Sequence, residues 1–267
     1  MSEQSDKRKV KNFYSKLAKA INDYNLIEKD DKILVGVSGG KDSMSLLSGL
    51  ASRAKYSDKP FSVVAVHIDV VNVPYSIDKE YIENFCKKNN IKFIVESIDV
   101  DFEKQSKKPQ CFVCAWHRRK RLFELSEELN CNKIALGHHM DDAIETLIIN
   151  MSYHNSISSM PAKLDMFEGR IQLIRPMILL SNKEVQDFSK LQSFPGEKEI
   201  CPWSDKTKRN QASEIIDEIE KRFKYARRGI FKSMSKIHLD YLPTEPGTDP
   251  VIRGLNLPKR DKDKDQS

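Results

Sequence analysis

The chain has 267 residues, of which 39% are hydrophobic and 31% are charged, and its formal net charge is +6. A chain of this length and composition can bury a substantial core as one large domain, or as one domain with a small appendage. No stretch approaches the roughly 20 consecutive apolar residues of a transmembrane helix, and the polar N-terminus does not resemble a secretory signal. We therefore expect a cytoplasmic protein without membrane association.

Strands and helices are predicted to alternate through the first part of the chain. Apolar residues at helical spacing predict a helix over residues 9–29. Short apolar runs predict five strands, at residues 32–37, 61–68, 92–98, 133–137 and 171–175. The intervening patterns predict helices at residues 41–54, 76–89, 116–130 and 141–154, and a polar loop over residues 99–110. This alternation predicts an α/β fold with a doubly wound, parallel five-stranded sheet.

The C-terminal part of the chain is predicted to be mostly helical. Ser181 precedes Glu184 by three positions, which is typical of a capping box at the start of a helix over residues 181–191. A long charged helix is predicted over residues 211–236, and the tail is rich in Pro, Gly and charge, which is typical of disorder. The predicted divisions are an N-terminal helical segment (1–30), an α/β domain (31–180), additional C-terminal helices (181–241) and a disordered tail (242–267).

The strongest local motif joins the first predicted strand to the next helix and reads Ser38-Gly-Gly-Lys-Asp-Ser43. At this position, backbone amides and a helix N-terminus face a ligand at the carboxyl end of the sheet, which suits a phosphate group. Gly39 and Gly40 allow close approach of the backbone. Hydroxyl groups and the charge of Lys41 add further contacts. A glycine turn that only reverses the chain would not account for all six residues.

A second motif, GHHMDDAIET, follows the fourth predicted strand and begins at Gly137. Mg²⁺ bound to phosphates is usually held by carboxylates, and the candidates here are Asp42, Asp141 and Asp142. One member of the adjacent pair is expected to cap the helix instead. His138 and His139 have two open interpretations, phosphate binding or completion of the turn.

Arg175-Pro176 follows the fifth predicted strand, where a guanidinium group could contact phosphates or could be an ordinary surface charge. The loop beginning at Ser38 is not a Walker A motif, because Val35 and Asp42 stand where that motif has glycine and Ser or Thr. Together, the three segments resemble the PP-loop ATP pyrophosphatases, or adenine nucleotide alpha hydrolases. That resemblance implies ATP binding by residues 31–180 and cleavage between the α and β phosphates.

The five cysteines are Cys86, Cys111, Cys114, Cys131 and Cys201. An odd number without an export signal disfavours a disulfide framework and favours metal, cluster or redox chemistry at the Cys-x-x-Cys pair. A zinc site would need a fourth ligand, such as a histidine, whereas three thiolates could hold an iron–sulfur cluster with one open iron. Cys86 and Cys131 are expected to be buried structural thiols.

Basic residues gather near the cysteines. Residues 104–121 include seven Lys or Arg residues and no carboxylate. Residues 206–228 include eight Lys or Arg residues and four Asp or Glu residues. Such clusters can neutralise nucleic-acid phosphates, although a charge run by itself is usually a solvated surface. Trp116 and Trp203 are expected to pack in the core, with stacking on a splayed base as the alternative.

The order of CFVCAWHRRKRLF, the GHHMDD run, SMPAKL, IRPM and the later cysteine resembles the tRNA 2-thiocytidine synthetase family over about residues 30–240. The resemblance implies that Cys111, Cys114 and Cys201 hold a [4Fe–4S] cluster and act in catalysis with Lys41 and Asp42. It also implies ATP and Mg²⁺ as cofactors, tRNA as substrate, a sulfur donor such as a cysteine desulfurase, and the option of a homodimer. The nucleotide contacts it implies are Ser38, Gly39, Gly40, Lys41, Asp42, Ser43, Gly137, His138, Asp141, Asp142 and Arg175.

The implied reaction is adenylation of a cytidine carbonyl oxygen followed by its replacement with sulfur, with the basic stretch around Arg118–Arg121 holding tRNA phosphates. Three alternatives remain open from the sequence. A lysidine synthetase-like ligase accounts for the nucleotide motifs but not for the cysteines. An RNA-binding or redox-sensing module accounts for the charge and the cysteines but not for two linked nucleotide motifs. A thiouridine-forming relative differs only in its target base.

Overall fold

The computed structural model describes residues 3–104, 109–195, 197–199, 208–238 and 241–242. Its centre is a six-stranded sheet with the order β4-β2-β1-β5-β7-β6. Five neighbouring strands are parallel, which confirms the predicted α/β class and the five predicted strands. Their bounds are β1 Lys32–Gly36, β2 Ser62–Val70, β4 Lys92–Ile98, β5 Lys133–Ala135 and β7 Ile171–Ile174.

The sheet has one strand more than predicted. The additional strand β6, Lys163–Met166, pairs antiparallel with β7 at the edge of the sheet. Only four residues long and largely exposed, β6 lacks the apolar run by which the other strands are recognised. A separate two-stranded sheet is formed by β3, Ser76–Ile77, and β8, Glu197–Glu199, which the sequence pattern also did not predict.

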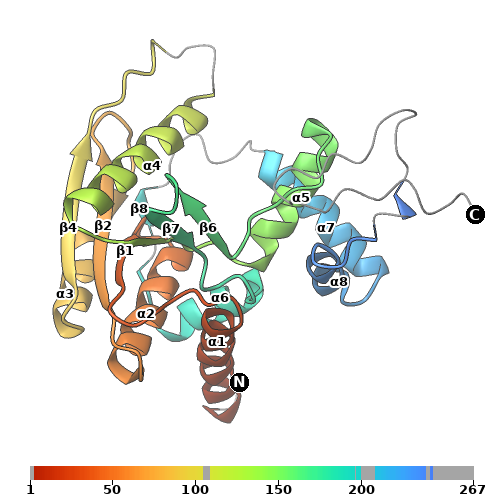
Figure 1. Cartoon of the computed structure of the whole chain (residues 1–267), viewed down its shortest axis with the longest axis horizontal. Helices are drawn as coiled ribbons and strands as arrows, with labels where there is room; N and C mark the ends of the chain where they lie inside the picture. Colours follow the sequence, from red (N-terminus) through yellow and green to blue (C-terminus); the bar gives the residue numbers. More distant parts are fainter. Residues whose placement is uncertain (1–2, 105–108, 196, 200–207, 239–240, 243–267) are drawn as a thin grey trace, which may run out of the picture.

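Helices cover both faces of the sheet, as a doubly wound topology requires (Figure 1). Alternate residues of β1 face opposite layers: Ile33 and Val35 join the core beneath α1, α2, α3 and α6, whereas Leu34 joins the core beneath α4. The first core holds α1 by a stacked pair of Phe13 and Phe188, with ring centroids 3.7 Å apart. The helix bounds on these faces are α1 Glu3–Asp23, α2 Lys41–Tyr56, α3 Lys79–Lys88, α4 Gln110–Glu128 and α6 Asn182–Leu191.

Two helix boundaries correct the sequence-based predictions, and one predicted helix cap is confirmed. The helix predicted from residue 76 begins at Lys79, because Asp78 accepts a hydrogen bond from the Tyr81 amide and caps it. The helix predicted from residue 116 begins at Gln110, directly after Pro109, so Cys111 and Cys114 are helical rather than at a loop end. The capping box predicted for α6 is present between Ser181 and Glu184.

The long helix predicted over residues 211–236 is wrong, because it is two helices. Helix α7, Lys208–Arg222, and helix α8, Ala226–Ser233, are separated at Tyr225, whose φ of +69° lies in the left-handed region. Both helices pack on α5, Met140–His154, through Ile144, Ile216 and Phe231. Figure 1 shows α5, α7 and α8 grouped to one side of the sheet. We call these three helices the helical lobe.

The remaining predictions about the chain's organisation have mixed outcomes. Side chains of α1 lie in the same core as those of α2 and α6. The domain boundaries predicted at residues 30, 180 and 241 stay predictions. Cys201 and the predicted tail from residue 243 lie outside the described residues. No helix in the described ranges has the length and apolar character needed to cross a membrane.

Candidate active site

The phosphate loop lies between β1 and α2, at the carboxyl end of the sheet. Gly39 has a φ of +78°, which favours glycine, and Gly40 is the first residue before α2. The hydroxyl group of Ser43 accepts a hydrogen bond from the Ser38 amide at 3.1 Å and donates one to the Gly40 carbonyl at 3.0 Å. These bonds hold the loop closed on itself. The amide groups of the first turn of α2 have no partner within the helix and are free to bind an anion.

Gly137 brings the second motif against the phosphate loop. A Cβ atom at this position would lie 3.1 Å from the Asp42 carbonyl carbon and 3.2 Å from the Ser43 amide nitrogen. The absence of a side chain therefore lets the start of the second motif pack directly on the first turn of α2. Asp42 and Lys41 form an ion pair of 2.6 Å beside this contact, and both side chains are about one third exposed.

The adjacent aspartates of the second motif are both engaged by protein groups. Asp142 accepts a hydrogen bond from the His139 amide at 2.8 Å, so it is the predicted helix cap, and it also meets Arg209 of α7 at 3.3 Å. Asp141 is buried and accepts hydrogen bonds from Arg227 of α8 at 2.6 Å and from the amide of Asn182 at 2.8 Å. The two carboxylates thus hold the helical lobe and the start of α6 against the nucleotide site.

His139 lies among three carboxylates. Its ring nitrogens are 3.8 Å from Asp42, 4.0 Å from Asp141 and 3.3 Å from Asp142. Its Nδ1 atom is buried and makes no hydrogen bond to a described residue. Within the described ranges, no group of three His, Cys, Asp or Glu side chains has the arrangement of a metal site. All three carboxylates have a cationic partner, but the side chain of Asp42 is 39% exposed, against 8% for Asp141 and 14% for Asp142. Asp42 is therefore the most accessible carboxylate for a Mg²⁺ ion that arrives with phosphates.

Arginines converge beside His138. Arg175 is only 7% exposed, which excludes an ordinary surface position, and it donates to the Pro161 carbonyl at 2.6 Å. Burial and the neighbouring charge of Arg119 lower the pKa of Arg175 to about 10. Burial also lowers the pKa of His138 to about 4, with Arg175, Arg209 and Arg119 adding to the effect. Cations that repel one another in this way are suited to an anionic ligand.

The Cys-x-x-Cys pair occupies the first turn of α4. Residues three apart lie on the same face of a helix, so the thiols of Cys111 and Cys114 suit two ligand positions of one cluster. Cys111 is exposed, and Cys114 packs against an apolar group that includes Val70 and Val113. The third implied ligand, Cys201, lies outside the described residues, so the meeting of all three thiols stays a prediction.

A short chain of contacts connects the cysteine helix to the phosphate loop. Arg118, one turn after Cys114, lies over the Tyr75 ring at 5.1 Å, and the Tyr75 hydroxyl donates to the Ser38 carbonyl. The Nε atom of Arg118 is buried and has no hydrogen-bond partner among the residues that the structure describes. With His67, Arg118 lines a small cleft of about 130 Å³ above the ends of β1 and β2. The cleft is lined both by Ser38 of the phosphate loop and by Arg118 of the helix that carries the cysteines.

The other two cysteines behave as predicted. Cys86 and Cys131 are buried, and burial raises the pKa of both thiols, that of Cys86 to about 11. Both are therefore protonated and weakly reactive near neutral pH. Trp116, in contrast, is 48% exposed, so core packing is the wrong interpretation for this side chain. Trp203 lies outside the described residues.

The predicted basic stretch from Arg118 to Arg121 divides into separate roles. Arg121 forms ion pairs with three carboxylates, those of Glu96, Glu124 and Glu128, at 2.7–3.2 Å. Its charge is therefore neutralised within the protein, so the prediction that Arg121 holds a tRNA phosphate is wrong. Arg119 is exposed and close enough to Arg175 to affect its pKa, so it remains a candidate for phosphate binding.

Comparison with known proteins identifies the family. The PP-loop domain family matches residues 3–211. A tRNA-cytidine(32) 2-sulfurtransferase of Francisella tularensis subsp. tularensis is 35% identical over 246 residues, which cover 89% of this chain and 91% of that protein. A tRNA-cytidine(32) 2-sulfurtransferase of Pelobacter propionicus is 34% identical over 230 residues, 85% of this chain and 86% of that protein. The chain belongs to the tRNA 2-thiocytidine synthetase family of PP-loop proteins.

The fold is also similar to that of a solved thiolase. The U34-tRNA thiolase NcsA from Methanococcus maripaludis, determined with its [4Fe-4S] cluster, superposes with a TM-score of 0.70 at 20% identity. The match covers 89% of this chain and 81% of that protein. It confirms the adenine nucleotide alpha hydrolase-like fold predicted from the sequence.

Several residues of the site could not be recognised from the sequence. Tyr75 and His67 belong to no motif, and Arg209 and Arg227 lie in a segment recognised only as basic. The one available signal was the position of Arg118, one helical turn after Cys114. Arg209 and Arg227 reach the site only because α7 and α8 pack on α5, whereas Tyr75 and His67 reach it from β2 and the segment that follows.

The raised pKa of Glu145 predicts that the free energy of unfolding depends on pH. Burial and the nearby Asp142 raise the pKa of Glu145 from 4.5 to about 7. The folded protein then binds more protons than the unfolded chain between these values, so its free energy of unfolding falls as pH rises from about 4.5 to 7. We expect Glu145→Gln to flatten this decline, measured as Tm at pH 5 and pH 7. Glu214→Gln, at an exposed position of α7, is the control, and an unchanged pH slope in E145Q would contradict the assignment.

Proposed function

We propose that this protein is an ATP-dependent tRNA sulfurtransferase that forms 2-thiocytidine in the anticodon loop, with cytidine 32 as the target. The observation that carries the proposal is the contact chain from the Cys111–Cys114 helix through Arg118 and Tyr75 to the phosphate loop. One helical turn, about 6 Å of rise, separates Cys114 from Arg118. A lysidine synthetase-like ligase would have no use for thiols at this place.

The first step is adenylation of the base. The carbonyl oxygen at C2 of cytidine attacks the α-phosphorus of ATP, the bond to the bridging oxygen breaks, and pyrophosphate leaves. We assign Ser38, Gly39, Gly40 and Ser43 to the pyrophosphate, because their amide and hydroxyl groups surround the start of α2. Lys41, Arg175 and a Mg²⁺ ion on Asp42 would stabilise the charge that develops on the phosphates.

In the second step, hydrosulfide attacks C2, a carbon–sulfur bond forms, the C2–O bond breaks, and AMP leaves with that oxygen and the electron pair of the broken bond. Cys111, Cys114 and Cys201 would hold the [4Fe–4S] cluster, which supplies an open iron position for sulfur when it is bound. The side chains of this chain orient the reactants: Arg118 lies between the thiols and the nucleotide cleft, and Arg119 is placed to hold a tRNA phosphate. The sulfur would come from a donor protein such as a cysteine desulfurase, and a thiol reductant would release it from the donor's persulfide as hydrosulfide. We place the reaction in the cytoplasm and propose that the enzyme can act as a homodimer.

Iron content and product formation test the proposal together. Protein purified without oxygen is expected to contain about four irons and four acid-labile sulfides per chain, and to convert tRNA cytidine to 2-thiocytidine with ATP, Mg²⁺ and sulfide. The triple variant Cys111→Ala, Cys114→Ala, Cys201→Ala is expected to lose both the iron and the product.

The matched control is the double variant Cys86→Ala, Cys131→Ala, which removes buried thiols remote from the motif and should keep both properties. Iron that persists in the triple variant would show that these cysteines are not the ligands. Adenylation of tRNA without any thiolated base in the wild type would favour a ligase that attaches an amine.

A further inference from the structure

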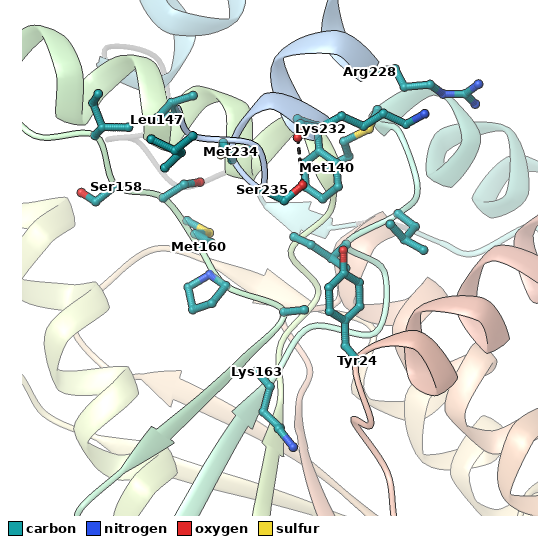
Figure 2. A pocket seen from close by; sticks show the side chains of 18 of the residues that line it. Tyr24, Met140, Leu147, Ser158, Met160, Lys163, Arg228, Lys232, Met234 and Ser235 are labelled. Carbon is teal, nitrogen blue, oxygen red and sulfur yellow. Dashed lines mark hydrogen bonds between the residues drawn. The ribbon is translucent and has the colours of Figure 1, made fainter. Parts of the chain in front are cut away.

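A groove of about 740 Å³ lies between the end of α1, helices α5 and α8, and the segment that precedes β6 (Figure 2). It is separate from the small cleft beside the phosphate loop, and no step of the proposed reaction uses it. Its floor is apolar and comes from three parts of the chain: Met140, Leu147, Met160, Phe231, Met234 and Ile237. An apolar hollow of this size on a folded domain is typical of a binding site.

The rim of the groove is positively charged. Among the described residues, five cations line it and no Asp or Glu does: Lys16, Lys19, Lys163, Arg228 and Lys232. Lys16 and Lys19 are neutralised by Glu184 and Asp23, which do not line the groove. Arg228 and Lys232 of α8 have no carboxylate partner in the described part of the chain, and the groove therefore carries uncompensated positive charge beside an apolar floor.

One wall of the groove has backbone groups available for hydrogen bonds. This wall is the irregular segment from Ile157 to Met160, whose amide N–H groups have no acceptor among the described residues. The segment is nevertheless held in place, because Ser159 donates to the Ala143 carbonyl and Asn150 donates to the Ser158 carbonyl. A run of unpaired amides held in place in this way suits the main chain of another peptide.

We infer that this groove binds an acidic, amphipathic peptide segment of a partner protein. Apolar side chains of such a segment would cover the floor, its carboxylates would meet Arg228 and Lys232, and its main chain would pair with the wall. A fatty acid would leave the wall amides unpaired, and RNA phosphates would leave the apolar floor exposed to water. A second copy of the chain in a symmetric contact would place the same cations opposite one another.

The groove is connected directly to the catalytic site. Pro161, at the end of the same wall, accepts the hydrogen bond from Arg175, and Met140 begins the helix that carries Asp141 and Asp142. A segment bound in the groove would thus lie against the back of the phosphate site without blocking the cleft beside Ser38. This placement suits a partner that stays bound during the reaction.

Fluorescence anisotropy of designed peptides tests the inference without any activity measurement. The probe is a fluorescein-labelled peptide with leucines at helical spacing and glutamates elsewhere, compared with the same peptide carrying glutamines or lysines. We expect the glutamate peptide to bind most tightly and to weaken with added salt. The variant Arg228→Glu, Lys232→Glu should reduce its affinity about tenfold or more. Ile237→Asp, at a residue 52% exposed, should do the same through the floor.

The matched control reverses two charges outside the groove, Arg222→Glu with Lys224→Glu, and is expected to leave peptide binding unchanged. Equal weakening by the control, or no binding of the glutamate peptide at all, would overturn the inference. So would groove-dependent binding of oleate or tRNA in place of the peptide, or a dimer in solution that Ile237→Asp dissociates.

Discussion

Replacing Gly39 with alanine is expected to lower the rate of ATP-dependent tRNA modification by about 100-fold. Gly39 has a φ of +78°, and a Cβ atom there would lie 2.5 Å from Cγ2 and 2.8 Å from Cβ of Ile77. Ile77 is buried and branched at Cβ, so it cannot move aside as a flexible side chain could. The loop must shift instead, which displaces the amides proposed to hold pyrophosphate. Pyrophosphate release with tRNA present measures the effect.

Gly169 provides the control for backbone strain. Its φ of +86° is similar, but no atom lies within 4 Å of the position that a Cβ would occupy, in the turn between β6 and β7. Gly169→Ala is therefore expected to lower the free energy of unfolding by about 1–2 kcal/mol, because alanine disfavours the left-handed region. The substitution causes no clash and lies outside the phosphate loop. We expect lower thermal stability with unchanged activity. Equal activities of G39A and the wild type would refute the assigned role of the loop.

Replacing Lys133 with methionine is expected to lower the free energy of unfolding by about 3–5 kcal/mol, because it leaves a buried charge unpaired. Lys133 of β5 is 2% exposed and its Nζ atom lies 2.7 Å from Asp31, which is 4% exposed. The same ammonium donates to the Leu26 carbonyl at 3.0 Å and so ties the α1–β1 connection to the sheet. Thermal unfolding should show a fall in Tm of roughly 10 °C.

Two further variants separate this charge effect from general damage. In Lys133→Met with Asp31→Asn, no charge is left buried, so part of the lost stability should return. Lys163→Met removes another lysine that reaches the same connection, at the Asn25 carbonyl, but from an exposed position. It should cost less than about 0.5 kcal/mol. A fall in Tm for K133M no larger than that for K163M would contradict the expected importance of the buried pair.

The elements that sequence reasoning predicted are those whose signals are local. The five parallel strands have apolar runs, and the phosphate loop combines a strand end, two glycines and a helix start within Ser38–Ser43. The capping box of α6 needs only Ser181 and Glu184. In each of these cases the interacting groups are close in the chain, so their spacing along the sequence already sets their geometry.

The missed elements have weak local signals that neighbouring segments decide. The strand β6 is short and largely exposed, and it exists because β7 offers an unpaired edge. The break between α7 and α8 depends on a left-handed Tyr225, a conformation that costs energy and that packing of both helices on α5 maintains. Helix α4 extends back to Gln110, although the polar residues before it predicted a loop.

The sequence by itself therefore determined the fold class, the family, the phosphate loop and the Cys-x-x-Cys pair, because each is written in adjacent or regularly spaced residues. Only the tertiary structure decided which carboxylate of the Asp141–Asp142 pair caps the helix and which is neutralised by Arg227. It also decided that Arg121 is neutralised internally while Arg118 faces the phosphate loop. The charge available to a ligand depends on partners from distant segments, and packing alone brings those partners into range.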